Sequence, residues 1–160
     1  MLTADQKQQF EAHGYLLVND VLDAADVLDP IVDEYAGLLD ELVDDLFARS
    51  EISQTFADLD FRDRMTKVYA ETGRTFAQYF NLSLPIVGVT ENTPFWTGPA
   101  IFNLIKAPAL LDVVESIIGP EIASNPIQHV RIKPPQELLP EDQLASGLVG
   151  TTPWHQDAAV

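Results

Sequence analysis

An amphipathic run between residues 29 and 49 constrains the fold of this 160-residue chain more than any other stretch. Its apolar side chains recur at the spacing of one helix face: Ile31, Tyr35, Leu38, Leu39, Leu42, Val43, Leu46 and Phe47. Asp23 is a suitable N-cap upstream, and Asp29-Pro30 predicts a restart or kink, because proline is tolerated in the first helical turn. Six acidic residues fall largely off the stripe: Asp33, Glu34, Asp40, Glu41, Asp44 and Asp45. We therefore expect a long helix that buries one face and exposes an acidic one.

The bulk composition predicts a single soluble domain over residues 1–160. Apolar residues make up 46% of the chain and charged residues 21%, proportions typical of a folded globular protein. No apolar run approaches the roughly 18 residues that a membrane span needs, and the first residues lack the order of a signal peptide. Because the chain contains no cysteine, disulfides and thiolate metal sites are excluded. A cytoplasmic location is the expectation.

The net charge of −16 is distributed unevenly along the chain. Residues 1–60 hold 15 acids and 2 bases, whereas the remaining hundred hold 10 acids and 7 bases. Such a field repels nucleic-acid phosphates and anionic membranes, so neither is expected as a partner. The acids lie on a predicted helix and not at the spacing of a calcium loop, which favours a solvated acidic face over a docking patch.

Helix caps and stops predict further helices at residues 4–13, 61–79, 100–105 and 108–118. In the first of these, Thr3 can form a capping box and Gly14 can end the helix. Near the start of the second lies a group of cations, Arg62, Arg64 and Lys67, which we expect to pair with the acidic helix before it. Each exposed pair would stabilise the fold by less than about 1 kcal/mol.

Two strands are predicted ahead of the strand that begins at Thr152, a short one at residues 15–18 and a longer one at residues 125–133. On the longer strand His129, Arg131 and Lys133 share one face. Three cationic or titratable side chains in a row suit an anion-binding site, although the same face can simply meet water. Residues 136–151 are rich in polar residues and turn formers, which is typical of a loop beside an active site.

The segment Thr152-Pro153-Trp154-His155-Gln156-Asp157 carries the strongest chemical signal in the chain. On an extended strand His155 and Asp157 project from the same face, because side chains alternate with a period of two. An imidazole and a carboxylate can supply two of the three ligands of a 2-His-1-carboxylate iron(II) site. A lone His-x-Asp is common by chance, and the alternative is a histidine paired with a nearby acid.

Four pieces of the chain occur in the order and rough spacing of one known family. They are Leu2-Thr3 through Phe10 to His13-Gly14-Tyr15-Leu16, then Leu110-Leu111-Asp112-Val113-Val114-Glu115 to Ile118-Gly119-Pro120, then Ile132-Lys133-Pro134-Pro135, and finally Pro153-Trp154-His155-Gln156-Asp157. In these pieces the sequence resembles the phytanoyl-CoA dioxygenase family, a branch of the iron(II)/2-oxoglutarate-dependent oxygenases.

The resemblance implies an α+β fold in which N-terminal helices pack on the first strands of a double-stranded β-helix, or jelly roll. It makes His155 and Asp157 ligands of iron(II), and it places Lys133 near the co-substrate 2-oxoglutarate. Arg131 and His129, on the same strand face, are expected to line that pocket. No catalytic residue beyond the metal ligands is implied. With a carboxylate at Asp157 the coordination position that a halide needs is occupied, so hydroxylation of a small molecule is expected and not halogenation.

The family pattern also requires a second histidine ligand and a 2-oxoglutarate-binding arginine downstream of the His-x-Asp pair. The sequence ends at Val160, so we expect an N-terminal portion of a longer dioxygenase domain, with an incomplete barrel and no turnover alone. Strand edges exposed by an incomplete barrel would favour self-association.

Two other functions fit the same residues. The first is a non-catalytic, acidic helical interaction module in which His155 and Asp157 are incidental. The second is a cupin-like metalloenzyme that does not use 2-oxoglutarate.

Overall fold

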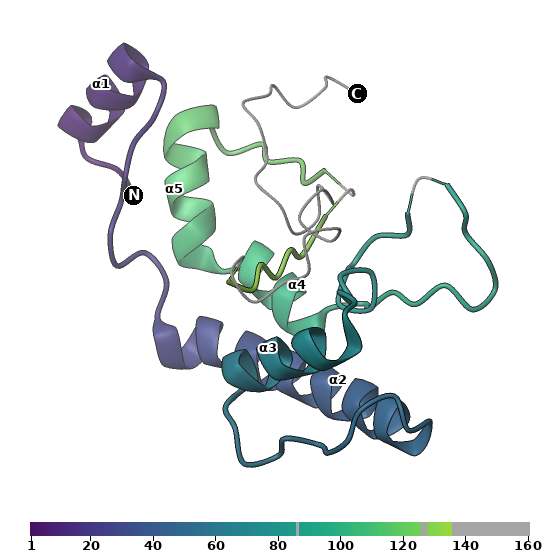
Figure 1. Ribbon diagram of the computed structural model, residues 1–160. Coiled ribbons are helices and arrows are strands. Elements are labelled where there is room, and N and C mark those ends of the chain that lie inside the picture. The colour runs from purple at the N-terminus through teal and green to yellow at the C-terminus, as the bar shows by residue number, and fades with distance from the viewer. Residues whose placement is uncertain (86, 126–127, 136–160) are drawn as a thin grey trace. The chain divides into compact units, whose positions relative to one another are not determined.

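The computed structural model describes residues 1–85, 87–125 and 128–135 (Figure 1). This part of the chain is helical. Its elements are α1 (Ala4–His13), the π-helical turn η1 (Ala24–Leu28), α2 (Asp29–Ala48), α3 (Phe61–Thr72), α4 (Pro99–Ile105) and α5 (Pro108–Ile118). None of the helices in these ranges is both long and apolar enough to cross a bilayer.

The prediction of an α+β fold with jelly-roll strands is wrong for the described residues, which contain no β-strand. Residues 128–130 lack strand pairing, and two of their backbone groups bond to side chains instead. The Ser83 hydroxyl donates to the carbonyl of Gln128 (2.6 Å), and the N–H of Val130 donates to Oδ1 of Asn81 (3.3 Å). The other predicted strand, at 15–18, also lacks a strand partner in the described chain.

The chain divides into two compact units. The first unit comprises Met1–Glu34 and Gly98–Ile127, and the second comprises Tyr35–Thr97 and Gln128–Val160. Helix α2 contributes to both, since the boundary falls between Glu34 and Tyr35. The single domain expected over residues 1–160 stays a prediction.

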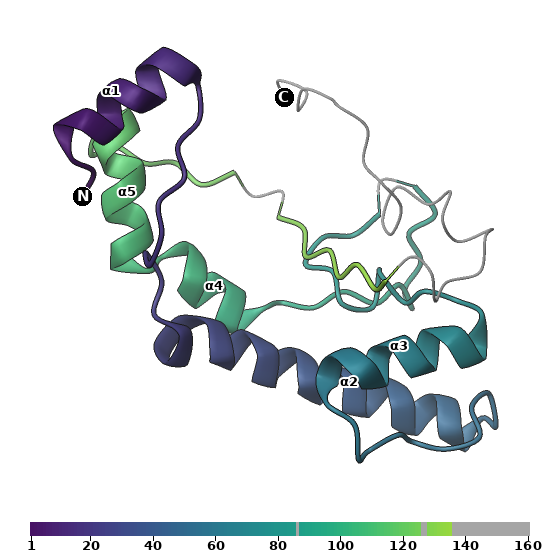
Figure 2. The same cartoon turned by 60° about the vertical axis from the view of Figure 1, so that its left-hand side comes forward.

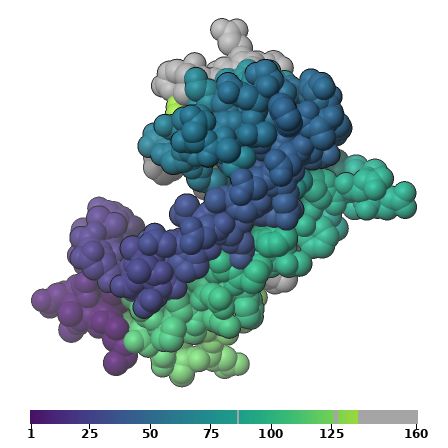
Figure 3. Space-filling model, turned by 90° about the horizontal axis from the view of Figure 1, so that it is seen from below, coloured from purple at the N-terminus to yellow at the C-terminus, as the bar shows by residue number. Residues whose placement is uncertain are grey.

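In the second unit α2 and α3 lie side by side (Figures 1 and 2). The amphipathic prediction for α2 is confirmed for six residues of its apolar stripe, which are buried: Tyr35, Leu38, Leu39, Leu42, Val43 and Leu46. It is wrong for Phe47, which is exposed, and Ile31 is half-buried. From α3, Met65, Val68 and Tyr69 complete this core. The acidic residues of α2 lie outside this core. In Figure 3 the outer face of the helix (blue) is not covered by other parts of the chain.

Arg64 is the one predicted cation that pairs with the acidic helix. The residue is 9% exposed, and its side chain forms an ion pair with Asp40 of α2 and donates through Nε to the carbonyl of Thr55 (2.9 Å). Within the described ranges Arg62 and Lys67 form no ion pair, so that part of the prediction is wrong. The helix is also shorter than the predicted 61–79, because it ends at Gly73.

Two glycines surrounded by open space give opposite predictions for an added methyl group. Gly37 lies within α2, where alanine restricts the unfolded chain, so Gly37→Ala should raise the free energy of unfolding by about 0.5–1 kcal/mol. Gly73 adopts a left-handed φ of +64°, so Gly73→Ala should lower that free energy by about 1–2 kcal/mol. Urea denaturation followed by circular dichroism measures both, and a loss of stability in Gly37→Ala would contradict an open helix position.

In the first unit, distant parts of the sequence are joined by backbone-to-side-chain hydrogen bonds. The predicted capping box of Thr3 with Gln6 is confirmed. The N–H of Leu2 donates to the Ser116 hydroxyl of α5 (3.0 Å), and the N–H of Ala100 in α4 donates to the Glu34 carboxylate of α2 (2.7 Å). Helices α4 and α5 confirm the predictions at 100–105 and 108–118, although α5 buries none of its residues completely.

Candidate functional site

The predicted iron ligands His155 and Asp157 lie outside the described residues, as does the predicted loop at 136–151. Within the described ranges, no three side chains among His, Cys, Asp and Glu are arranged to hold a metal ion. The structure therefore offers no alternative metal centre in this part of the chain, and the candidate site is described from the residues predicted to lie beside it.

The alternation predicted for residues 128–133 is confirmed even though no strand forms. Three side chains are exposed, namely His129, Arg131 and Lys133, and the three between them are half-buried, namely Gln128, Val130 and Ile132. This alternation follows from extended backbone, in which successive side chains point to opposite sides. The segment thus presents an imidazole, a guanidinium and an ammonium group on one exposed side. This arrangement agrees both with an anion-binding site and with a surface that only meets water.

Asn81 holds this segment in place, and sequence reasoning did not identify it. The residue is 5% exposed. Its Oδ1 accepts hydrogen bonds from the N–H groups of Leu82 (2.9 Å) and Val130 (3.3 Å), and its backbone carbonyl accepts one from the N–H of Trp96 (2.7 Å). A polar side chain between two apolar residues, Phe80 and Leu82, was the only sequence signal for this role.

The same asparagine also contacts the imidazole of His129. Nδ1 of His129 lies 3.2 Å from Nδ2 and 3.3 Å from Oδ1 of Asn81, so this nitrogen either accepts a hydrogen bond from Nδ2 or donates one to Oδ1, according to the tautomer. In both cases Nδ1 is bonded to Asn81, and Nε2 is the ring nitrogen that can meet another partner.

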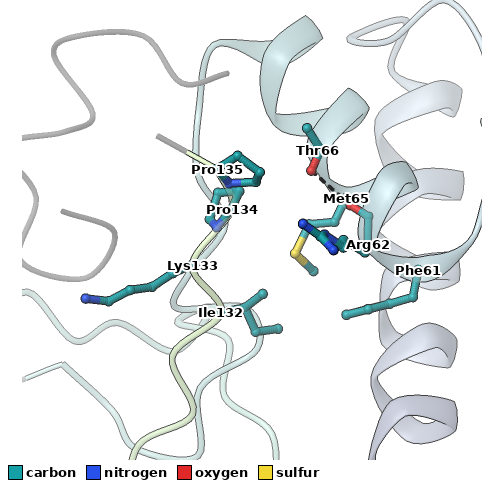
Figure 4. A pocket seen from close by; sticks show the side chains of 8 residues that line it. All are labelled: Phe61, Arg62, Met65, Thr66, Ile132, Lys133, Pro134 and Pro135. Carbon is teal, nitrogen blue, oxygen red and sulfur yellow. Dashed lines mark hydrogen bonds between the residues drawn. The ribbon is translucent and has the colours of Figure 1, made fainter. Parts of the chain in front are cut away.

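A pocket of about 470 Å³ lies on the other side of this segment, between α3 and residues 132–135 (Figure 4). Among the described residues, two short stretches of chain line it: Phe61, Arg62, Met65 and Thr66 from α3, and Ile132, Lys133, Pro134 and Pro135 opposite. Figure 4 shows Ile132 directed toward α3, whereas the ammonium group of Lys133 points away from it. The predicted co-substrate residue and this pocket therefore face different sides of the segment.

Comparisons of the chain with protein-family models, with curated proteins and with solved structures find no significant match. The resemblance to the phytanoyl-CoA dioxygenase family stays a prediction that rests on the four sequence pieces.

Proposed function

We propose that this chain supplies two ligands, His155 and Asp157, to the iron(II) site of a 2-oxoglutarate-dependent dioxygenase that hydroxylates a small molecule. The observation that carries the proposal is the His-x-Asp pair within Pro153-Trp154-His155-Gln156-Asp157, downstream of a segment that exposes three cationic or titratable groups on one side. The proposal rests on the chemistry of these groups and not on a jelly roll, because a site and its fold are separate inferences.

The positive charges on the exposed side of residues 129–133 suit the binding of the co-substrate. 2-Oxoglutarate is a dianion, and the exposed side chains of Arg131 and Lys133 provide two positive charges in a chain that is otherwise strongly acidic. His129 can add a hydrogen bond through Nε2, since its Nδ1 is bonded to Asn81. These groups would attract and orient the co-substrate.

Iron(II) with bound 2-oxoglutarate supplies the oxidising chemistry for inserting oxygen into a C–H bond. The contribution of this chain is to present a neutral imidazole at His155 and a carboxylate at Asp157, which together leave coordination positions for other ligands. Because a carboxylate occupies the position at Asp157, no halide can bind there, and hydroxylation is the expected outcome.

Metal binding by this chain tests the proposal directly. We expect His155→Ala to weaken the binding of cobalt(II), a spectroscopic substitute for iron(II), by at least about tenfold, because even the loss of an outer-shell partner has that effect. The measurement is an anaerobic titration followed by visible absorption. His13→Ala is the matched control, since His13 is exposed at the end of α1 and should leave the affinity unchanged. Equal affinities for the wild type and His155→Ala would remove the basis of the iron site.

The alternative of a non-catalytic helical module is favoured by the absence of strands from the described residues and by the uncovered acidic face of α2 (Figure 3). It predicts that metal binding is weak and identical in the wild type, His155→Ala and His13→Ala. The same titration therefore separates the two functions. The cupin-like alternative gains no support from the described residues, because it too requires strands.

A further inference from the structure

The pocket between α3 and the segment Ile132–Pro135 carries an inference that is independent of the iron site. We propose that this pocket binds a small monocarboxylate with an apolar body, such as an aromatic or short-chain acyl acid, and that Arg62 pairs with its carboxylate. The contacts proposed for this binding come from described residues and do not involve 2-oxoglutarate.

The size and lining of the pocket suit a ligand that is mostly apolar. A volume of about 470 Å³ falls within the range of about 300–1,000 Å³ that is typical of small-molecule sites. The half-buried side chains of Phe61 from α3 and Ile132 opposite provide accessible apolar surface, whereas Met65 and Pro134 line the pocket but are already buried (Figure 4). Burying an apolar ligand between these walls removes its surface and theirs from water, which is the main driving force for binding.

Arg62 is the cation available to fix the orientation of such a ligand. The chain has 25 acidic residues and 9 basic ones, and three of its other arginines, Arg49, Arg64 and Arg74, pair with carboxylates of the protein. Among the described residues the Arg62 guanidinium forms neither an ion pair nor a hydrogen bond, while its backbone carbonyl accepts a bond from Thr66 (2.9 Å; Figure 4). A planar guanidinium binds a carboxylate through two parallel hydrogen bonds, so an organic acid satisfies it.

The charge of the ligand follows from the cations that face the pocket. Lys133 contributes to the wall, but its ammonium group points away in Figure 4, which leaves Arg62 as the cation that the described part of the chain directs at the cavity. A net charge of −16 repels additional negative charge. One guanidinium in that field favours a monoanion with a large apolar part over phosphate or a dicarboxylate.

Phenylacetate and hexanoate are suitable probes, because each combines one carboxylate with an apolar body. We expect both to bind the wild-type chain, as measured by saturation-transfer NMR and calorimetry at physiological ionic strength. Arg62→Gln should weaken binding by about tenfold or more, since a hydrogen bond to a charged group is lost. Lys67→Gln is the matched control. Lys67 is exposed on the same helix and does not line this pocket, so its replacement should leave the affinity unchanged.

Two comparisons on the wild-type chain keep the test independent of how the variants fold. 2-Phenylethanol has a similar apolar body without the charge and should bind at least about tenfold more weakly than phenylacetate. Inorganic phosphate, an anion without an apolar part, should not compete with phenylacetate. Failure of both acids to bind, equal binding of 2-phenylethanol, competition by phosphate, or unchanged affinity in Arg62→Gln would each overturn the proposal.

Discussion

Replacement of Leu39 by alanine is expected to lower the free energy of unfolding of the second unit by about 2–5 kcal/mol. Leu39 lies on α2 with 0% of its surface exposed, in the core that α2 and α3 form together. Removal of its isobutyl group loses the transfer free energy of the apolar atoms and leaves a cavity, because closely packed neighbours relax only in part. Urea denaturation followed by tryptophan fluorescence measures the change, since Trp96 belongs to this unit.

Leu84→Ala is the matched control for this experiment, because it makes the same chemical change in the same unit at a side chain that is 45% exposed. Its effect on the free energy of unfolding should stay within about 1 kcal/mol. Similar losses in Leu39→Ala and Leu84→Ala would show that α2 does not bury the face described here.

Tyr69→Phe is expected to change how stability depends on alkaline pH. Tyr69 is 1% exposed, and its hydroxyl has no hydrogen-bond partner in the described structure. Burial raises the pKa of Tyr69 far above its ordinary value of 10.0. The folded state therefore holds this proton at a pH where the unfolded chain releases it.

The sign of the pH effect follows from that difference in bound protons. Below about pH 10 both states keep the phenol neutral, and the group contributes no pH dependence. Above that value the unfolded state loses the proton first, so the free energy of unfolding falls by up to about 1.4 kcal/mol per pH unit. Near neutral pH, Tyr69→Phe should be about 1 kcal/mol more stable than the wild type, because an unpaired buried hydroxyl has been removed.

Chemical denaturation at a series of pH values between neutral and strongly alkaline measures this slope. Tyr69→Phe should reduce the slope without abolishing it, since the pKa of Tyr79 is also raised, first by burial and then by the carboxylates of Glu41 and Asp45. An identical alkaline slope in the wild type and Tyr69→Phe would contradict the buried position of this phenol.

The helices were predictable because their signals are local. The periodicity of the α2 stripe, the capping box at Thr3 and the stops at Gly14 and Gly119 each depend on residues within a few positions of one another. The helix after Asp60 was predicted to continue to residue 79, because apolar residues recur past Gly73. The helix ends earlier, because Gly73 adopts a left-handed backbone conformation that interrupts the helical hydrogen bonds.

The prediction of strands was wrong because alternation along the sequence does not show whether a segment has a partner strand, which can lie anywhere in the chain. Residues 128–130 have the alternation of a strand, yet their backbone bonds go to Ser83 and Asn81, which precede them by 45 to 49 positions. No local signal reveals such side-chain partners. The pocket at Arg62 escaped prediction for the same reason, since α3 and Ile132–Pro135 lie far apart in sequence.

The hydrogen bond from α4 to the Glu34 carboxylate has a consequence for how this helix forms. Helix α4 spans Pro99–Ile105, has no side-chain cap of its own, and relies on a carboxylate 66 positions earlier to bind the N–H of Ala100. So short a segment is not stable as an isolated helix, and bringing two distant positions together carries an entropic cost. We therefore expect α4 to form together with its contact to α2 and not as an independent helix.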